Sequence, residues 1–136
     1  MNKIEEKIIG INALDSRIKE LEQNLALLEK QIAELQSCQL ALDELKNIKK
    51  ETEMFSSISP GVFVKSKLLD NSHVIIDVGA KVFCKKNIND AKEIIQPKLN
   101  SALEIYNKMI QEINILAQNI ISLEKDIKDI REQEGK

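Results

Sequence analysis

The chain carries few residues that could do chemistry. Its one histidine is His73, and its two cysteines are Cys38 and Cys84. Structural zinc takes four ligands, so three scattered candidates do not predict a metal site. The cysteines form no Cys-x-x-Cys pair, which indicates reduced thiols. No glycine-rich phosphate-binding motif occurs, so no nucleotide is expected. We therefore expect a protein that is not an enzyme and that uses no metal or cofactor.

The composition excludes several classes of protein. With 136 residues the chain has room for one domain. Hydrophobic residues make up 43% but aromatic residues only 3%, a balance typical of long solvated helices. The net charge of -2 argues against nucleic acid or an anionic membrane surface as a partner. No apolar run is long enough to span a membrane, and the start MNKIEEKII lacks the apolar stretch of a signal peptide, so we expect a cytoplasmic protein.

Both ends of the chain carry a seven-residue apolar repeat. Apolar residues recur at alternating steps of three and four, which predicts a coiled-coil stripe on each of two long helices. Beyond Leu35 the first stripe loosens because Gln39 occupies the next a position, and we expect a different packing partner there. Asn89 or Asp90 is expected to cap the second helix, with Pro97 near its first two turns. The stripes are Ile11, Leu14, Ile18, Leu21, Leu25, Leu28, Ile32 and Leu35, and then Ile95, Leu99, Ala102, Tyr106, Met109, Ile113, Leu116, Ile120, Leu123, Ile127 and Ile130.

The middle of the chain reads as four short strands. Residues 54–88 contain MFSSI, VFVKSKL, HVIIDV and KVFCK, which are rich in β-branched and aromatic residues. Pro60-Gly61 fits a type II turn, and Gly79-Ala80 fits the type II′ turn of a two-residue hairpin. These turns predict two β-hairpins joined through Asp70-Asn71-Ser72.

Two hairpins let the chain leave its first helix and return alongside it. We therefore expect the helices to pair antiparallel within one chain; parallel pairing with another chain is the alternative. The fold class is mainly α with a small β region: a long antiparallel coiled coil joined by two β-hairpins that assemble into an oligomeric β-barrel body. The single domain, 1–136, would comprise a helix over 1–52, the hairpins over 53–88 and a helix over 89–134.

The predicted strands are apolar on both faces, so they need neighbours. Unpaired edges on this scale are usually closed by strands of another chain, which predicts an obligate oligomer. The expected oligomer interface is formed by Phe55, Val62, Phe63, Val64, Val74, Ile75, Ile76, Val78, Val82 and Phe83.

The central sequence SISPGVFVKSKLLDNSHVIIDVGAKVFCKKNINDAKEII, set between two heptad helices, resembles the α-class subunit of archaeal prefoldin. The likeness covers nearly the whole chain and is most specific from Pro60 to Ala91. It implies a hexamer of two α and four prefoldin β subunits, with six coiled-coil tentacles on a double β-barrel. It also implies a chaperone that binds unfolded client proteins without ATP and passes them to the group II chaperonin.

The residues themselves predict where clients bind. Ile8 and Ile9 lie off the stripe of the first helix, and antiparallel pairing brings them beside the end of the second helix, where Ile121 is also off the stripe. An exposed apolar patch of this kind can bind non-native chains. The alternative is that Ile8 and Ile9 continue a frayed seam. The expected client-binding residues are Ile4, Ile8, Ile9, Ile11, Ile121, Leu123, Ile127 and Ile130.

A second functional class stays open. The chain could be a structural coiled-coil scaffold, including a self-assembling prefoldin-like filament, in which strand edges polymerise and client capture is secondary. The mass of the assembly, with and without a β-type partner, separates the two classes.

Overall fold

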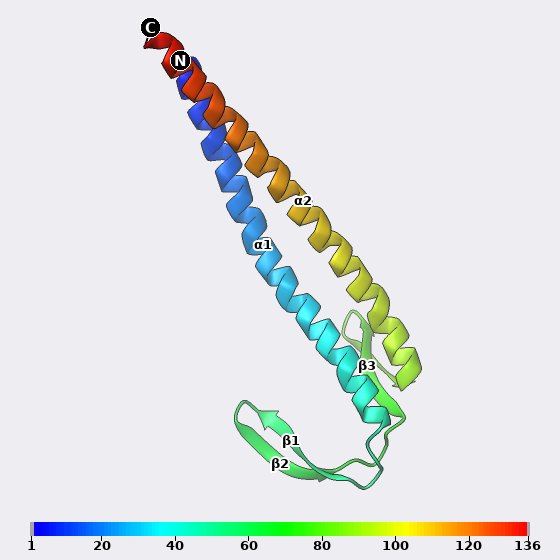
Figure 1. Ribbon diagram of the computed structural model, residues 1–136. Helices are drawn as coiled ribbons and strands as arrows, with labels where there is room; N and C mark the ends of the chain where they lie inside the picture. Colours follow the sequence, from blue (N-terminus) through cyan, green and yellow to red (C-terminus); the bar gives the residue numbers. More distant parts are fainter. Residues whose placement is uncertain (1, 136) are drawn as a thin grey trace. The chain divides into compact units, whose positions relative to one another are not determined.

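The computed structural model describes residues 2–135 and consists of two long helices with four strands between them (Figure 1). This confirms the predicted fold class, with two helices joined by two antiparallel hairpins. The chain forms two compact units, which we call the terminal unit (residues 2–32 and 101–135) and the hairpin unit (Ala33–Asn100). The elements are α1 (Lys3–Lys46), β1 (Glu53–Ser59), β2 (Val62–Lys67), β3 (His73–Gly79), β4 (Val82–Asn87) and α2 (Ile88–Glu134).

In the terminal unit, α1 and α2 pair antiparallel within the chain. As residue numbers rise along α1, those of the contacting residues on α2 fall, and the two chain ends lie at the same end of this unit (Figure 1). Three polar contacts mark the alignment: Lys7 to Asp126 at 3.3 Å, Arg17 to Glu112 at 3.3 Å, and the Tyr106 hydroxyl to Glu29 Oε1 at 3.3 Å.

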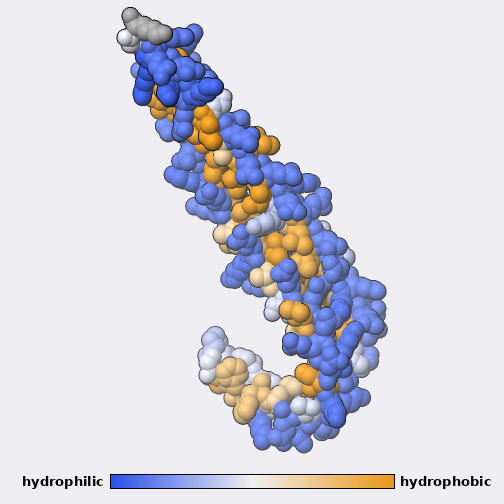
Figure 2. Space-filling model, in the orientation of Figure 1, coloured by the Kyte–Doolittle hydropathy of each residue, from blue (hydrophilic) through white to orange (hydrophobic). Residues whose placement is uncertain are grey.

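The heptad stripes form the seam between these helices. Leu21 and Ile127 are buried, and Ile32 and Ala102 are buried further along. In Figure 2, apolar side chains form a band along the helices, bordered by hydrophilic ones. The stripe predicted from the sequence is thus the face on which the helices meet, because only that face removes its leucines and isoleucines from water.

In the hairpin unit, the apolar repeat of α1 continues beyond Leu35 to Leu42, and the different packing partner expected there is strand β3, which packs against the cluster that contains Leu42. Gln39 is half-buried and its Nε2 donates to Gln96 Oε1 across the helix pair at 2.6 Å. Leu42, on the next turn of the same stripe, is buried. The repeat survives a polar residue because two facing amides satisfy each other's hydrogen-bonding groups.

Helix α1 ends at Lys46, before the expected limit at residue 52. The amides of Asn47 and Ile48 bond to carbonyls three residues back, which tightens the last turn. Beyond it, the chain already joins the first hairpin, because the Glu51 amide donates to the Leu68 carbonyl at 2.7 Å. Glu51 itself has a φ of 70° and lies in a turn closed by the Thr52 amide, which donates to the Lys49 carbonyl at 3.3 Å.

Helix α2 begins at Ile88, and its cap is Asn87, not Asn89 or Asp90 as the sequence predicted. The Asp90 amide donates to Asn87 Oδ1 at 2.8 Å, and Asn87 Nδ2 donates to Asp90 Oδ2 at 3.1 Å, so the two side chains close the first turn reciprocally. Because the helix starts here, Pro97 lies inside it, beyond the first two turns.

The four strands form two separate antiparallel pairs, β1 with β2 and β3 with β4. At the first turn Gly61 has a φ of 80°, as the third residue of the predicted type II turn requires. At the second turn the positive φ values belong to Ala80 (51°) and Lys81 (61°). These are the central residues of a type I′ turn, so the expected Gly79-Ala80 type II′ turn is wrong. Gly79 occupies the adjacent irregularity, with a φ of 132°.

Replacing Lys81 by glycine is expected to stabilise the protein. A residue with a side chain is strained at positive φ, whereas glycine is not, so the substitution removes backbone strain from the folded state. Glycine also raises the conformational entropy of the unfolded state, which opposes folding, but we expect this effect to be the smaller of the two. We expect a gain of about 0.5 kcal/mol in the free energy of unfolding, measured by chemical denaturation. Lys85→Gly, in the extended strand β4, is the control and should lose a similar amount. A loss for Lys81→Gly would contradict the turn assignment.

The second hairpin packs onto the helices. Leu42, Ile88, Ala91 and Ile95 form a buried cluster, and Val74 and Ile76 of β3 pack against it together with Leu35 and Leu45. This contact covers part of one face of the β3–β4 hairpin. Along residues 2–135, neither helix is long and apolar enough to cross a membrane.

Candidate functional site

The first hairpin leaves large apolar side chains in water on both of its faces. In the β1–β2 register Phe55 lies opposite Lys65 and Phe63 opposite Ser57, which places both phenylalanines on one face. Val64, opposite Ser56, lies on the other face. Phe55 is 72% exposed and Phe63 is 60% exposed. A two-stranded sheet cannot cover its own faces, so these side chains stay in water unless another element or another chain packs on them.

The helices cover only part of one face of the second hairpin, because Val82 shares the face of Ile76 by alternation and is 54% exposed. Val74 and Ile76 point to the helical cluster and are half-buried, whereas Ile75 is 73% exposed and Phe83 is 62% exposed on the opposite face. The predicted interface residues therefore divide into two that pack within the chain and eight that lie in water. We call the latter the hairpin surface: Phe55, Val62, Phe63, Val64, Ile75, Val78, Val82 and Phe83.

Each strand also presents a free edge. Because each sheet has only two strands, every strand pairs on one side and leaves its other row of backbone groups unpaired. Two more exposed side chains belong to this region, Ile58 (64%) and Leu69 (74%). Neither was predicted as a site residue, although Ile58 lies in the apolar run of β1 and Leu69 lies two residues after β2.

In the terminal unit, three of the predicted client-binding residues are exposed. Ile8, Ile9 and Ile121 are 40%, 55% and 64% exposed, and we call them the terminal patch. Ile127 is buried in the seam, so it faces α1 and not solvent. The other four are half-buried: Ile4, Ile11, Leu123 and Ile130. The off-stripe positions are thus the accessible ones, as the heptad reading predicts for residues that lie outside the seam.

Further apolar side chains lie exposed along the helices. Leu40, Leu103 and Ile105 are 63%, 37% and 48% exposed. Leu27 and Ile115 are also exposed and were not singled out from the sequence. Their positions off the seven-residue stripe are the signal that could have found them.

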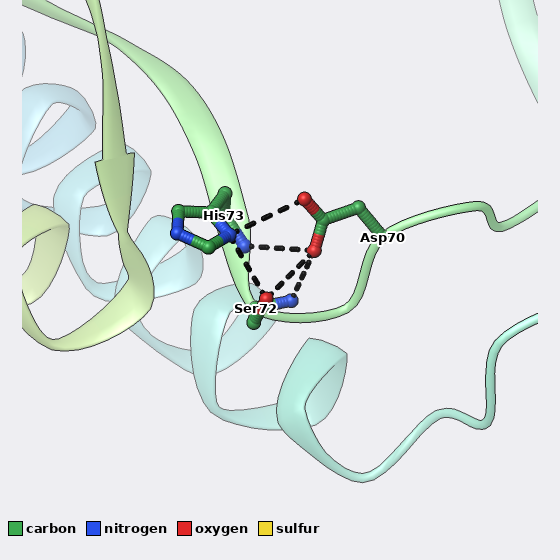
Figure 3. A network of polar contacts seen from close by, with 3 residues as sticks. All are labelled: Asp70, Ser72 and His73. Carbon is green, nitrogen blue, oxygen red and sulfur yellow. Dashed lines mark hydrogen bonds and ion pairs between the residues drawn. The ribbon is translucent and has the colours of Figure 1, made fainter.

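The connection between the hairpins is held by Asp70 (Figure 3). Its Oδ1 accepts from the amide of Ser72 at 2.8 Å, from the Ser72 hydroxyl at 2.8 Å and from the amide of His73 at 3.2 Å. These bonds, led by the one from the Ser72 amide, lower the pKa of Asp70 to about 2. His73 Nδ1 is the ring nitrogen that approaches both Asp70 and Ser72. A catalytic triad needs the serine and the carboxylate on opposite ring nitrogens, so this is a turn and not a triad.

The low pKa of Asp70 predicts a specific acid response. A carboxyl whose pKa is lower in the folded state stabilises the fold above its unfolded pKa of about 3.9 and stops doing so as the pH falls to about 2. We expect the midpoint of urea unfolding to fall more steeply between pH 4 and pH 2 in the wild type than in Asp70→Asn, whose amide cannot ionise. Equal slopes for the two proteins would contradict the role of this carboxylate.

The remaining reactive side chains do not converge. Cys84 lies opposite Ile76 in the second hairpin and is half-buried, whereas Cys38 is exposed on α1, and both are free thiols. Across the described part of the chain, no group of three or more His, Cys, Asp or Glu side chains is placed to hold a metal ion. The surfaces that remain as candidate sites are apolar.

The chain combines an antiparallel helix pair, two β-hairpins between the helices in sequence, and apolar surfaces that lie in water. A family model described as prefoldin subunit matches residues 14–133. The chain belongs to the prefoldin family. Prefoldins are chaperones whose subunits form oligomers with other prefoldin subunits, so the class of this protein is a chaperone subunit.

Curated relatives agree with this assignment. Prefoldin subunit alpha 1 of Thermococcus kodakarensis is 32% identical over 71% of this chain and 66% of its own length, just under two thirds. Prefoldin subunit alpha of Pyrococcus horikoshii is 24% identical over 98% of this chain and 90% of its own length. Human prefoldin subunit 5 is 25% identical over 82% of this chain and 75% of its own length.

A solved structure shares the fold. One chain of the cryo-EM structure of filamentous PFD from Methanocaldococcus jannaschii superposes with a TM-score of 0.66 and is 20% identical, covering 89% of this chain and 94% of that chain. At this identity the comparison bears on the fold alone.

Proposed function

We propose that this chain is an ATP-independent holdase subunit, which binds unfolded proteins at the terminal patch and passes them to the group II chaperonin as part of a hexamer of two α and four β subunits. One observation carries the proposal: large apolar side chains lie in water in both units of the chain. The relatives named prefoldin subunit alpha support the α role.

The hairpin surface supports assembly. Strands with free edges and exposed phenylalanines are stabilised when strands of other subunits close them into a barrel, which removes both the edges and the apolar faces from water. We assign the eight residues of the hairpin surface to contacts between subunits. Val74 and Ile76 support the interface indirectly, because they fix the second hairpin to the helices.

The terminal patch supports client capture. Burying about 100 Å² of apolar surface contributes only about 2.5 kcal/mol before ordering costs, so one subunit binds a client weakly. Several subunits held on one body bind the same unfolded chain together and raise the effective affinity. Capture by burial needs no nucleotide, in line with a sequence that has no glycine-rich phosphate motif.

The proposal is tested by mixing this chain with a β-class prefoldin subunit. Native mass spectrometry should give a discrete hexamer of two copies of this chain and four β subunits. The complex should suppress aggregation of a denatured client without ATP, and adding a group II chaperonin with ATP should then release folded client. No complex, or a complex without holdase activity, would contradict the proposal.

A self-assembling scaffold is the second candidate, and one observation favours it. The structurally similar chain from Methanocaldococcus jannaschii belongs to a filamentous PFD. In the mass experiment, open-ended assembly of this chain alone would support the scaffold, whereas a closed hexamer that forms only with the β subunit supports the holdase.

Replacing Ile8, Ile9 and Ile121 by serine is expected to weaken the suppression of client aggregation. The complex should be needed at a concentration at least about tenfold higher for the same suppression, because several subunits bind one client together and the losses at the subunits multiply. The matched control replaces Leu27, Ile105 and Ile115, which are exposed elsewhere on the helices, by serine. The control should keep wild-type suppression, and both variants should keep the mass of the complex. Undiminished suppression by the terminal-patch variant would exclude the patch as the client site.

A further inference from the structure

The charge of the chain is divided unevenly along its length. Between residues 46 and 92, nine lysines stand against five acidic residues, although the whole chain has a net charge of -2. The segment that contains both hairpins is therefore basic, and the rest of the helices is acidic. An overall charge near zero conceals this asymmetry.

The strands repeat one charge pattern. The first strand of each hairpin carries a single carboxylate and no lysine, Glu53 in β1 and Asp77 in β3. The second strand of each hairpin carries two lysines and no carboxylate: Lys65 and Lys67 in β2, and Lys85 and Lys86 in β4. The strands β2 and β4 thus present basic edges.

These lysines border the exposed apolar side chains. Lys65 lies directly opposite Phe55, and Lys85 lies directly opposite Ile75, so each shares a face with residues of the hairpin surface. Lys65, Lys67 and Lys85 are all exposed, whereas Lys86, opposite Val74 on the helix-facing side of the second hairpin, is half-buried. A chain that covers the hairpin surface must also meet these charges.

The carboxylates of the strands are already engaged in their own hairpins. Glu53 Oε2 lies 3.1 Å from Lys65 Nζ, and Asp77 Oδ1 accepts from the Gly79 amide at 2.8 Å. Among residues 2–135, no carboxylate lies within ion-pair distance of Lys67, Lys85 or Lys86. The strands of one copy hold four lysines and two carboxylates, and both carboxylates already accept a bond within their own hairpin, so a second copy cannot supply a carboxylate for each lysine.

Pairing β2 or β4 with the same strand of a second copy would place lysines beside lysines. Neighbouring strands lie about 4.8 Å apart, and like charges on directly opposite residues destabilise a sheet, whereas opposite charges stabilise it. Lysines on an edge strand also prevent its unspecific pairing with identical edges. The edges therefore select against the same strand of a second copy and in favour of an acidic strand.

We propose that β2 and β4 are the edges at which this chain receives a different subunit, and that this partner is recognised by carboxylates on its edge strand that pair with Lys67, Lys85 and Lys86. The inference rests on the proposed function as a hetero-oligomer subunit, and it supplies the chemistry by which the partner is chosen. The phenylalanines provide the area that is buried, and the lysines determine which chain buries it.

The test uses a charge-reversed copy of this same chain, Lys67→Glu, Lys85→Glu and Lys86→Glu, as the acidic partner. Mixed with wild type at about 50 mM salt, it should form mixed oligomers at a concentration at least about tenfold lower than either protein needs alone. The preference should shrink at 0.5 M salt, because screening weakens exposed ion pairs. The matched control is Lys30→Glu, Lys98→Glu and Lys128→Glu, which changes the net charge equally on the helices and should show no preference for wild type.

A neutral variant, Lys67→Met, Lys85→Met and Lys86→Met, provides a second test that does not depend on the charge-reversed variant. It is needed if circular dichroism shows that the charge-reversed variant does not fold. It should self-associate at least about tenfold more readily than wild type, because it removes the repulsion alone. Mixing without preference, or unchanged self-association of the neutral variant, would overturn the inference. Neither outcome bears on holdase activity, which is measured with the β-class subunit, so the two proposals fail separately.

Discussion

Replacing Phe63 and Phe83 by aspartate is expected to dissociate the assembly while leaving each chain folded. The two side chains are 60% and 62% exposed, so the isolated chain loses little packing when they change. In the assembly, each loses about 2 kcal/mol of apolar burial and adds a carboxylate that must leave water. Together these effects raise the dissociation constant by about a thousandfold or more. Sedimentation velocity over a concentration series measures this shift.

The matched control changes Leu27 and Ile115 to aspartate. These side chains are about as exposed as the phenylalanines, but they lie on the helices of the terminal unit. The control should sediment as wild type does, and circular dichroism should show the same helix content in all three proteins. An intact oligomer in the double aspartate variant would show that subunits meet at some other surface.

Replacing Ile95 by alanine is expected to cause the largest loss of stability of a single truncation. Ile95 is 4% exposed and packs in the cluster with Leu42, Ile88 and Ala91, which also receives β3. Removing its side chain beyond Cβ costs about 2–5 kcal/mol, because the transfer energy is lost and a cavity remains. Chemical denaturation followed by circular dichroism measures the change.

Ile105→Ala makes the same chemical change at a position that is 48% exposed and serves as the control. It should cost less than about 1 kcal/mol, because an exposed side chain has little apolar contact to lose. Comparable losses at both positions would mean that the cluster under the second hairpin does not hold the unit together.

The sequence predicted the helices and the strand faces well because both depend on periodicity. The seven-residue stripe from Ile11 to Leu35 and the one from Ile95 to Ile130 could be read directly, since burial in a helix pair follows that repeat. Alternation likewise placed Val74 and Ile76 on one strand face. It could not tell that this face packs on the helices of the same chain, because alternation defines a face but not its neighbour.

The wrong predictions concern the cap of α2 and the second turn, where local hydrogen bonds and backbone dihedral angles decide the structure and the apolar repeat does not. Asn87 caps α2 because its side chain reaches the Asp90 amide, and the sequence offers several amide and acidic residues in a row as candidates. The second turn falls on Ala80 and Lys81 although glycine, which precedes them, adopts positive φ more easily. Among the predicted client-binding residues, Ile127 is buried in the seam, as its register on the stripe requires.

The amide pair between Gln39 and Gln96 bears on how the helices can be lengthened or shortened. Shifting one helix along the other by one heptad would face each glutamine with a different residue and leave a half-buried amide without its hydrogen-bond partner. The hydrogen-bonded pair thus favours one alignment of α1 with α2. Shorter or longer forms of the protein should therefore be obtained by removing or adding whole heptads in matched numbers on both helices, and a change to one helix alone should misalign it.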